Sequence, residues 1–165
     1  MAQFGFDEGR FPYFRTLHSL AFKMLGLQRD EVMTNAHYRK LGKALGVEFK
    51  GIYDEDIGIH TGDGLGDKCS RIESLARVGL RSVDDQYHLT PTNDLTLHAV
   101  KQYHSALATY KRENSLLDFT DMLQNYNVTL PVDICIFDEA QDLSSLQYRM
   151  AILASQQASE VYIAG

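Results

Sequence analysis

The stretch that decides the fold is Val132-Asp133-Ile134-Cys135-Ile136-Phe137-Asp138-Glu139-Ala140-Gln141-Asp142. Its first six residues are apolar and rich in β-branched side chains, with Asp133 as the one interruption. Such a run is typical of a parallel strand buried on both faces. Asp138 and Glu139 follow where this strand ends, and ligands of open α/β sheets bind at the carboxyl ends of the strands. This point of the chain is therefore the first candidate for a functional site.

The residues after these carboxylates complete a strand–helix–strand unit. A helix is predicted over 144–157, since Ser144-x-x-Gln147 is a capping box. A short strand is predicted over 161–164, and together these elements predict a βαβ unit and an α/β fold. Upstream, the apolar spacing is mostly helical, with a glycine-rich break. In chain order we expect a short strand over 11–16, helices from Leu17 and over 30–45, strand fragments and loop over 46–67, and helices around Ile72 and over 95–114.

Composition and charge exclude several classes of protein. The chain has 165 residues, of which 44% are hydrophobic and 23% charged, so it is neither a disordered tail nor a disulfide-built miniprotein. It contains no run of 18 apolar residues that would predict a membrane span. The net charge is −6, yet residues 1–50 hold 8 Lys/Arg against 5 Asp/Glu. This allows a local phosphate-facing surface without requiring one.

The cysteines and histidines give no sign of a metal site. Cys69 and Cys135 lack a CxxC spacing, which indicates reduced thiols in a cytoplasmic protein, with one disulfide as the open alternative. The six histidines lack the spacing of zinc ligands. Several aromatic residues lie among the cations of the first third and could stack on bases, although aromatics at this spacing are more often core.

The adjacent carboxylates allow three interpretations. An Asp at the end of a strand can hold Mg²⁺ through water, and a Glu beside it can orient and deprotonate an attacking water. The plainer interpretation is that Asp138 and Glu139 only terminate the strand. A third is a two-metal nuclease that also uses Asp118, Asp121 and Asp142.

Residues 138–142, Asp-Glu-Ala-Gln-Asp, resemble motif II (Walker B) of superfamily 1 DNA helicases of the UvrD/Rep type. Three further segments resemble this family in its order: residues 16–20 are similar to motif Ib, 118–123 to the helix before motif II, and 161–165 to the strand that leads into motif III. The resemblance implies a helicase or translocase of DNA repair or replication. It implies a partial RecA-like parallel sheet of the P-loop NTPase type at 1–28 and 113–165, with a mostly helical inserted subdomain at 29–112.

The resemblance also implies roles for single residues. Asp138 would hold the Mg²⁺ of bound MgATP, and Glu139 would be the general base for hydrolysis. Gln141 and Asp142 would belong to the nucleotide site and link it to neighbouring motifs. Asp118 and Asp121 are expected instead to be helix-start acids that hold the subdomain junction together.

A second group of residues would face DNA. Thr16, His18 and Ser19 would lie on the side that binds single-stranded DNA or a single-strand/double-strand junction, with Thr16 as the best candidate for a phosphate contact. Arg15 replaces the glycine that is usual in the family, and it would either add a phosphate contact or simply be exposed. For His18 the alternative is a helix-start histidine that bonds to the backbone.

A phosphate-binding GxxxxGK(S/T) loop does not occur in these 165 residues. Residues 62–70 resemble such a loop only superficially, since Asp67 stands where a glycine is needed, and we expect an exposed loop there. We therefore expect ATP hydrolysis to need the remainder of a helicase chain, in the cytoplasm of a bacterial or virus-infected cell and away from membranes. The alternative is a stand-alone, non-catalytic module that binds single-stranded DNA or a protein.

Overall fold

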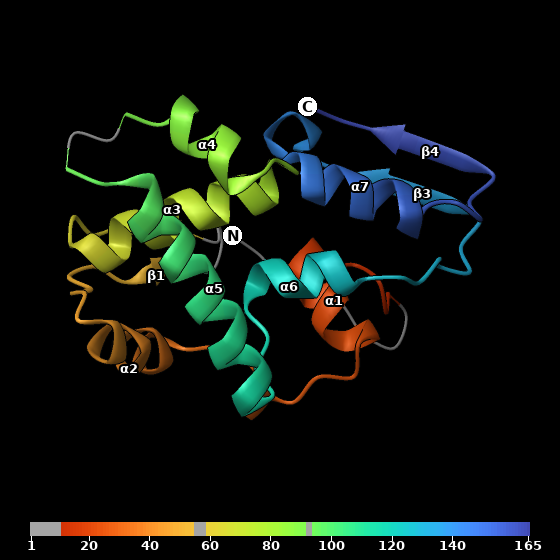
Figure 1. Ribbon diagram of the computed structural model, residues 1–165. Helices are drawn as coiled ribbons and strands as arrows, with labels where there is room; N and C mark the ends of the chain where they lie inside the picture. Colours follow the sequence, from red (N-terminus) through yellow and green to blue (C-terminus); the bar gives the residue numbers. More distant parts are fainter. Residues whose placement is uncertain (1–10, 55–58, 92–93) are drawn as a thin grey trace, which may run out of the picture.

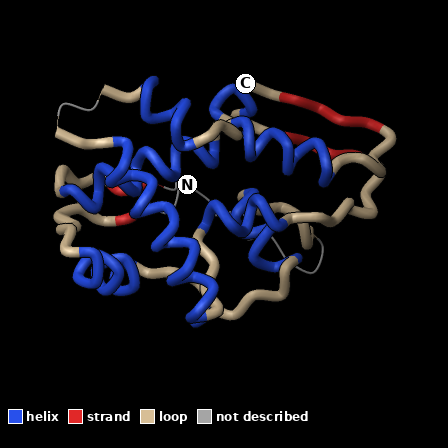
Figure 2. Tube along the Cα trace, in the orientation of Figure 1, coloured by secondary structure: helices blue, strands red, loops and turns tan. Residues whose placement is uncertain are grey.

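The computed structural model describes residues 11–54, 59–91 and 94–165. Helices dominate the fold, and the strands form two small pairs (Figures 1 and 2). None of the helices in these ranges is both long enough and apolar enough to cross a membrane. The elements are α1 (Leu17–Met24), η1 (Arg29–Glu31), α2 (Asn35–Leu45), β1 (Tyr53–Asp54), β2 (Ile59–His60), α3 (Leu65–Val78), α4 (Val83–Leu89), α5 (Leu97–Asn114), α6 (Phe119–Asn125), β3 (Ile134–Phe137), η2 (Ala140–Asp142), α7 (Ser145–Ala154) and β4 (Glu160–Ile163).

The predicted strand–helix–strand unit is confirmed. Strands β3 and β4 pair in parallel, with Ile134 opposite Glu160 and Phe137 opposite Ile163. The capping box of α7 is also confirmed, because the Ser144 hydroxyl accepts the N–H of Gln147 at 3.3 Å. The predicted burial of the first strand on both faces is wrong. Its residues alternate between exposed and half-buried, since in the described part of the chain β3 and β4 stand as a sheet of two strands.

The apolar side chains gather in two clusters. One joins α2, α3 and α5, and the other joins α1, α6 and α7. The buried members of the first include Met33, Tyr38, Leu41, Ile72, Val100, Tyr103 and Leu107, and those of the second include Leu20, Ala21, Met122, Leu123, Leu146 and Met150. The division into 1–28, 29–112 and 113–165 stays a prediction.

Two predictions near the N-terminal side are wrong. Residues 11–16 form turns instead of a strand, and the Phe14 N–H donates to the Phe11 carbonyl at 3.2 Å. The second helix begins at Asn35, not at residue 30. Val32 forms a β-bridge with Leu117, and the Met33 N–H donates to the Leu117 carbonyl at 2.9 Å. These long-range backbone bonds hold the segment extended and override the helical spacing.

The exposed loop predicted over 62–70 is also wrong. The segment enters α3, and Asp67 is fully buried there. Its carboxylate Oδ2 accepts the backbone N–H of Lys50 at 2.8 Å and of Gly64 at 3.0 Å. This carboxylate therefore ties two loops together. Gly51 lies so close to Gly62 that a Cβ atom on it would overlap the neighbouring backbone.

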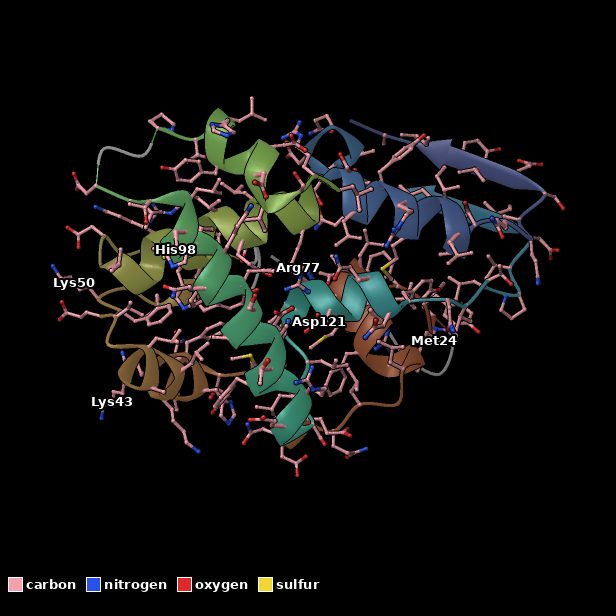
Figure 3. The ribbon with its side chains drawn as sticks, viewed as in Figure 1. Met24, Lys43, Lys50, Arg77, His98 and Asp121 are labelled. Atoms are coloured by element: carbon pink, nitrogen blue, oxygen red, sulfur yellow. The ribbon has the colours of Figure 1, made fainter. Side chains whose placement is uncertain are left out.

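A buried ion cluster joins α3, α5 and α6. Arg77 of α3 and Lys111 of α5 both contact Oδ2 of Asp118, at 2.7 and 2.6 Å. Lys111 also contacts Asp121 at 2.7 Å, and Figure 3 shows Arg77 beside Asp121 near the centre of the molecule. Burial by itself would raise the pKa of Asp118, but Arg77 and Lys111 outweigh it and hold that pKa well below its usual value. We call Arg77, Lys111, Asp118 and Asp121 the ion cluster.

The ion cluster also forms the start of α6. The Asp118 carboxylate accepts the N–H of Asp121 at 2.7 Å, and the Asp121 carboxylate accepts the N–H of Asp118 at 2.9 Å. The expectation that these two are helix-start acids is confirmed, and they join α6 to the two longer helices.

We predict that Arg77→Met lowers the free energy of unfolding by about 3–5 kcal/mol, because Lys111 is then the one cation left to balance the buried Asp118 and Asp121. Urea unfolding at neutral pH measures this change. Lys101→Met is the matched control, since the Lys101–Asp84 pair is as short, at 2.6 Å, but about half exposed on both sides. Its loss should cost less than about 1 kcal/mol. Equal losses in the two variants would contradict a structural role for the buried pair.

His60 is a buried neutral histidine. Its Nδ1 lies 2.8 Å from the Ser70 hydroxyl, and its ring meets that of Tyr38 edge-on at 4.4 Å. Burial lowers the pKa of His60 to about 4, with Asp67 opposing the shift and Arg71 adding to it. The folded state therefore favours the uncharged ring.

We predict that the free energy of unfolding falls by on the order of 3 kcal/mol as the pH drops from about 6.5 to about 4. Within this window the unfolded chain takes up a proton on His60, whereas the folded chain does not. The fall should flatten in His60→Gln and persist in His98→Gln, which changes an exposed histidine of α5. An unchanged pH profile in His60→Gln would overturn this assignment.

Candidate functional site

The loop after β3 carries the candidate carboxylates at the carboxyl ends of both parallel strands. The Ala164 N–H donates to the Phe137 carbonyl, and the Ala140 N–H donates to the Ala164 carbonyl, both at 2.9 Å. These two bonds hold the end of β4 beside the loop that begins at Asp138. The arrangement matches the place where open α/β sheets bind ligands.

Glu139 adopts a backbone conformation that is rare for its residue type. Its φ of 52° and ψ of 39° lie in the left-handed helical region, and its N–H donates to Oδ1 of Asp138 at 3.0 Å. A residue other than glycine loses on the order of 1–3 kcal/mol there, and such strain clusters at functional sites.

Gln141 connects Glu139 to the end of β4. Its side-chain amide donates to Oε2 of Glu139 at 2.6 Å. On its other side the Gln141 side chain lies against Gly165, where a Cβ atom would overlap its Oε1. Gln141 therefore links the Glu139 side chain to the residues that follow β4.

The loop is acidic and open to solvent. Asp138, Glu139 and Asp142 are exposed, and no Lys or Arg of the described ranges forms an ion pair with them. Mg²⁺ in nucleotide sites uses one or two carboxylates, with waters and phosphates as its other ligands. The hard oxygen of Asp138 fits such a ligand, and a phosphate-binding loop would have to complete the site.

The described residues form no metal site by themselves. They contain no group of three or more His, Cys, Asp or Glu placed to hold a metal ion. The five-carboxylate nuclease centre is not assembled, because Asp118 and Asp121 are bound in the ion cluster. A groove of about 570 Å³ between α7 and the turn after α3 is lined by Leu143, but by neither Asp138 nor Glu139.

The residues predicted to face DNA lie at the start of α1. Thr16 and Ser19 are exposed, and the Thr16 hydroxyl caps the helix by accepting the Ser19 N–H at 3.3 Å. Arg15 is half-buried; its Nε donates to the Pro12 carbonyl at 3.0 Å, and its guanidinium lies 3.4 Å from the Ser19 hydroxyl.

His18 and most aromatic side chains of the first third of the chain pack against other side chains of the protein. The His18 ring meets Phe119 of α6 edge-on, with ring centroids 5.8 Å apart. Tyr13 and Phe22 pack against the second apolar cluster, and Tyr38 is buried in the first. Phe14 is 67% exposed.

Sequence reasoning missed Arg77 and Lys111. Their partner Asp118 lies 41 residues from Arg77, and only the folded chain brings them together. Comparison with known proteins adds no further information, since the chain matches no protein-family model, no curated protein and no solved structure.

We predict that Glu139→Gly raises the free energy of unfolding by about 1 kcal/mol, because glycine adopts the left-handed conformation without strain. Thermal or urea unfolding measures the change. Glu160→Gly is the control, since glycine in a strand should instead lower stability by about 0.5–1 kcal/mol. A loss of stability in Glu139→Gly would contradict backbone strain at this position.

Proposed function

We propose that this chain is the carboxylate-bearing part of the ATP-binding domain of a DNA helicase or translocase of the UvrD/Rep type. The observation that carries the proposal is the position of Asp138 and Glu139 at the carboxyl end of β3, beside the end of the parallel strand β4. The left-handed backbone of Glu139 is compatible with it; Leu80 and Ser115 have the same conformation at the ends of helices.

In this proposal each residue of the loop has a distinct task. Asp138 would hold Mg²⁺, which when bound neutralises charge on the nucleotide phosphates. Glu139 would orient a water and accept its proton, and Gln141 would hold the Glu139 carboxylate through the 2.6 Å hydrogen bond. Asp142 would add negative charge to the same loop. Thr16 and Ser19, with Arg15, would contact phosphates of single-stranded DNA.

A helical subdomain and a RecA-like sheet are the finer part of the same proposal. The mixed fold, the parallel β3–β4 pair and the mostly helical middle are compatible with that architecture. Because the 165 residues lack a GxxxxGK(S/T) loop, the phosphate-cradling part would come from the remainder of a helicase chain.

ATP turnover by the protein expressed from its complete gene tests this proposal. We predict that Glu139→Gln lowers kcat at least about a hundredfold, because a general base contributes that much or more. Asp133→Asn is the matched control, since this exposed carboxylate lies before β3, at the opposite end of the strand. It should leave turnover unchanged. Turnover that persists in Glu139→Gln would refute the proposed role, and the 165-residue chain alone should show none.

The alternative is a stand-alone module that binds single-stranded DNA or a protein. The exposed Thr16 and Ser19 at the start of α1 favour it, because DNA binding through these two side chains would not require bound ATP. With few cations available, the helicase proposal predicts weak DNA binding by the 165-residue chain that disappears as salt rises. Tight binding that survives high salt would favour the module.

A further inference from the structure

Helix α2 has a buried inner side and an exposed basic outer side. On the inner side Tyr38 and Leu41 join the first apolar cluster, and a Cβ atom on Gly42 would overlap the ring of Phe49. The outer side is formed by positions 36, 39, 40 and 43, which have the i, i+3, i+4, i+7 spacing of one helix face. They are Ala36, Arg39, Lys40 and Lys43, and all four are exposed. We call the three cations of this set the basic face.

No acidic side chain of the described ranges neutralises the basic face. Helix α2 contains neither Asp nor Glu, and none of its three cations forms an ion pair with a described residue. By contrast, Lys50, Lys68 and Lys101 each have a carboxylate within 4.0 Å. Figure 3 shows Lys43 directed away from the rest of the molecule. Because like charges at this helical spacing repel each other, a partner that brings negative charge stabilises the helix.

The side chains of α2 suit a phosphate backbone better than bases. Lys and Arg bind phosphates without reading the sequence. Ala36 and Ala44 are small and exposed, so they leave room for close approach. The aromatic rings of α2 are not offered for stacking, since Tyr38 is buried and the ring of His37 lies against Tyr110, with centroids 6.5 Å apart. A duplex presents about one charge per 1.7 Å of its axis, twice the density of one strand.

We propose that the basic face of α2 binds the phosphate backbone of duplex DNA, independently of sequence. The three cations extend over about 6 Å of the helix axis and reach up to three phosphates. Figure 1 shows α2 on the opposite side of the molecule from β3, so the duplex lies away from the acidic loop. The net charge of −6 keeps other parts of the surface from adding much to the contact. The choice of DNA rests on the proposed function.

Anisotropy of a labelled duplex of about 20 base pairs, mixed with the 165-residue chain as salt rises, tests the proposal. Three phosphate contacts predict that the logarithm of the association constant falls against the logarithm of salt with a slope of about −2.7. Replacing Arg39, Lys40 and Lys43 together by Gln should weaken binding at low salt at least about tenfold and remove most of this slope. Gln forms helices about as well as Lys and Arg, so urea unfolding should show an unchanged fold.

Arg81→Gln, Lys101→Gln and Arg149→Gln, made together, are the matched control. These three cations are also exposed, they lie outside α2, and their loss changes the net charge by the same amount. The control variant should keep the slope of the parent chain and lose less than about twofold in affinity. Equal losses in the two triple variants would overturn the proposal, because the binding would then depend on total charge and not on the basic face.

Vesicles of phosphatidylserine and a single strand of the same length test for other anionic partners. The chain should bind the duplex more tightly than either one at the same salt. Binding to the vesicles without binding to the duplex would overturn the proposal in favour of a membrane surface. A single strand that binds more tightly than the duplex, and loses this binding in the α2 variant, would also overturn it. Failure of the proposed function is distinguishable, since that is measured as ATP turnover in Glu139→Gln.

Discussion

The ion cluster of Arg77, Lys111, Asp118 and Asp121 is the interaction on which the arrangement of this protein depends. Taking charged groups out of water costs several kcal/mol for each ion, and only close opposite charges with good hydrogen bonds offset that cost. The cluster meets this condition, with contacts of 2.6 to 2.7 Å to one oxygen of Asp118. It therefore fixes the start of α6 against α3 and α5. From there α6 packs its Met122 and Leu123 with the buried side chains of α7, the helix that follows the acidic loop.

This arrangement separates two kinds of carboxylate that look alike in the sequence. Asp118 is 2% exposed and bonded to cations, and it stabilises the fold. Asp138 and Glu139 are exposed, have no cation partner in the described ranges, and lie on a loop whose backbone is strained. A protein that keeps strain and uncompensated charge at the end of a strand gains no stability from them. Under the proposed function, these carboxylates would serve a cation and a reaction.

The sequence predicts the parts of this structure that depend on local signals. The strand before Asp138, the capping box at Ser144 and the parallel return strand need only a few neighbouring residues, and all three are confirmed. The position of the acidic loop follows from them. Long-range contacts cannot be predicted from such local signals. The bridge between Val32 and Leu117 keeps this segment extended, so α2 begins at Asn35 and not at residue 30.

The candidate site follows the same division. Its residue types and their place after β3 could be predicted, but the left-handed turn at Glu139 and the contact of Gln141 with Gly165 could not, since both depend on where β4 ends. In the same way, the burial of Asp67 depends on backbone N–H groups 16 and 17 residues away. The pairing of Arg77 with Asp118 joins elements 41 residues apart, and helical periodicity carries no information about it.

The central claim is that the carboxylates of this chain divide into a structural set and a chemical set. Urea unfolding of Asp118→Asn and Asp138→Asn, measured side by side at neutral pH, tests it most directly. The account predicts a loss of about 3–5 kcal/mol for Asp118→Asn, because Arg77 and Lys111 lose the buried carboxylate that they share, and a change within about 0.5 kcal/mol for Asp138→Asn. Comparable losses in the two variants would contradict it, since Asp138 would then be part of what holds the fold together.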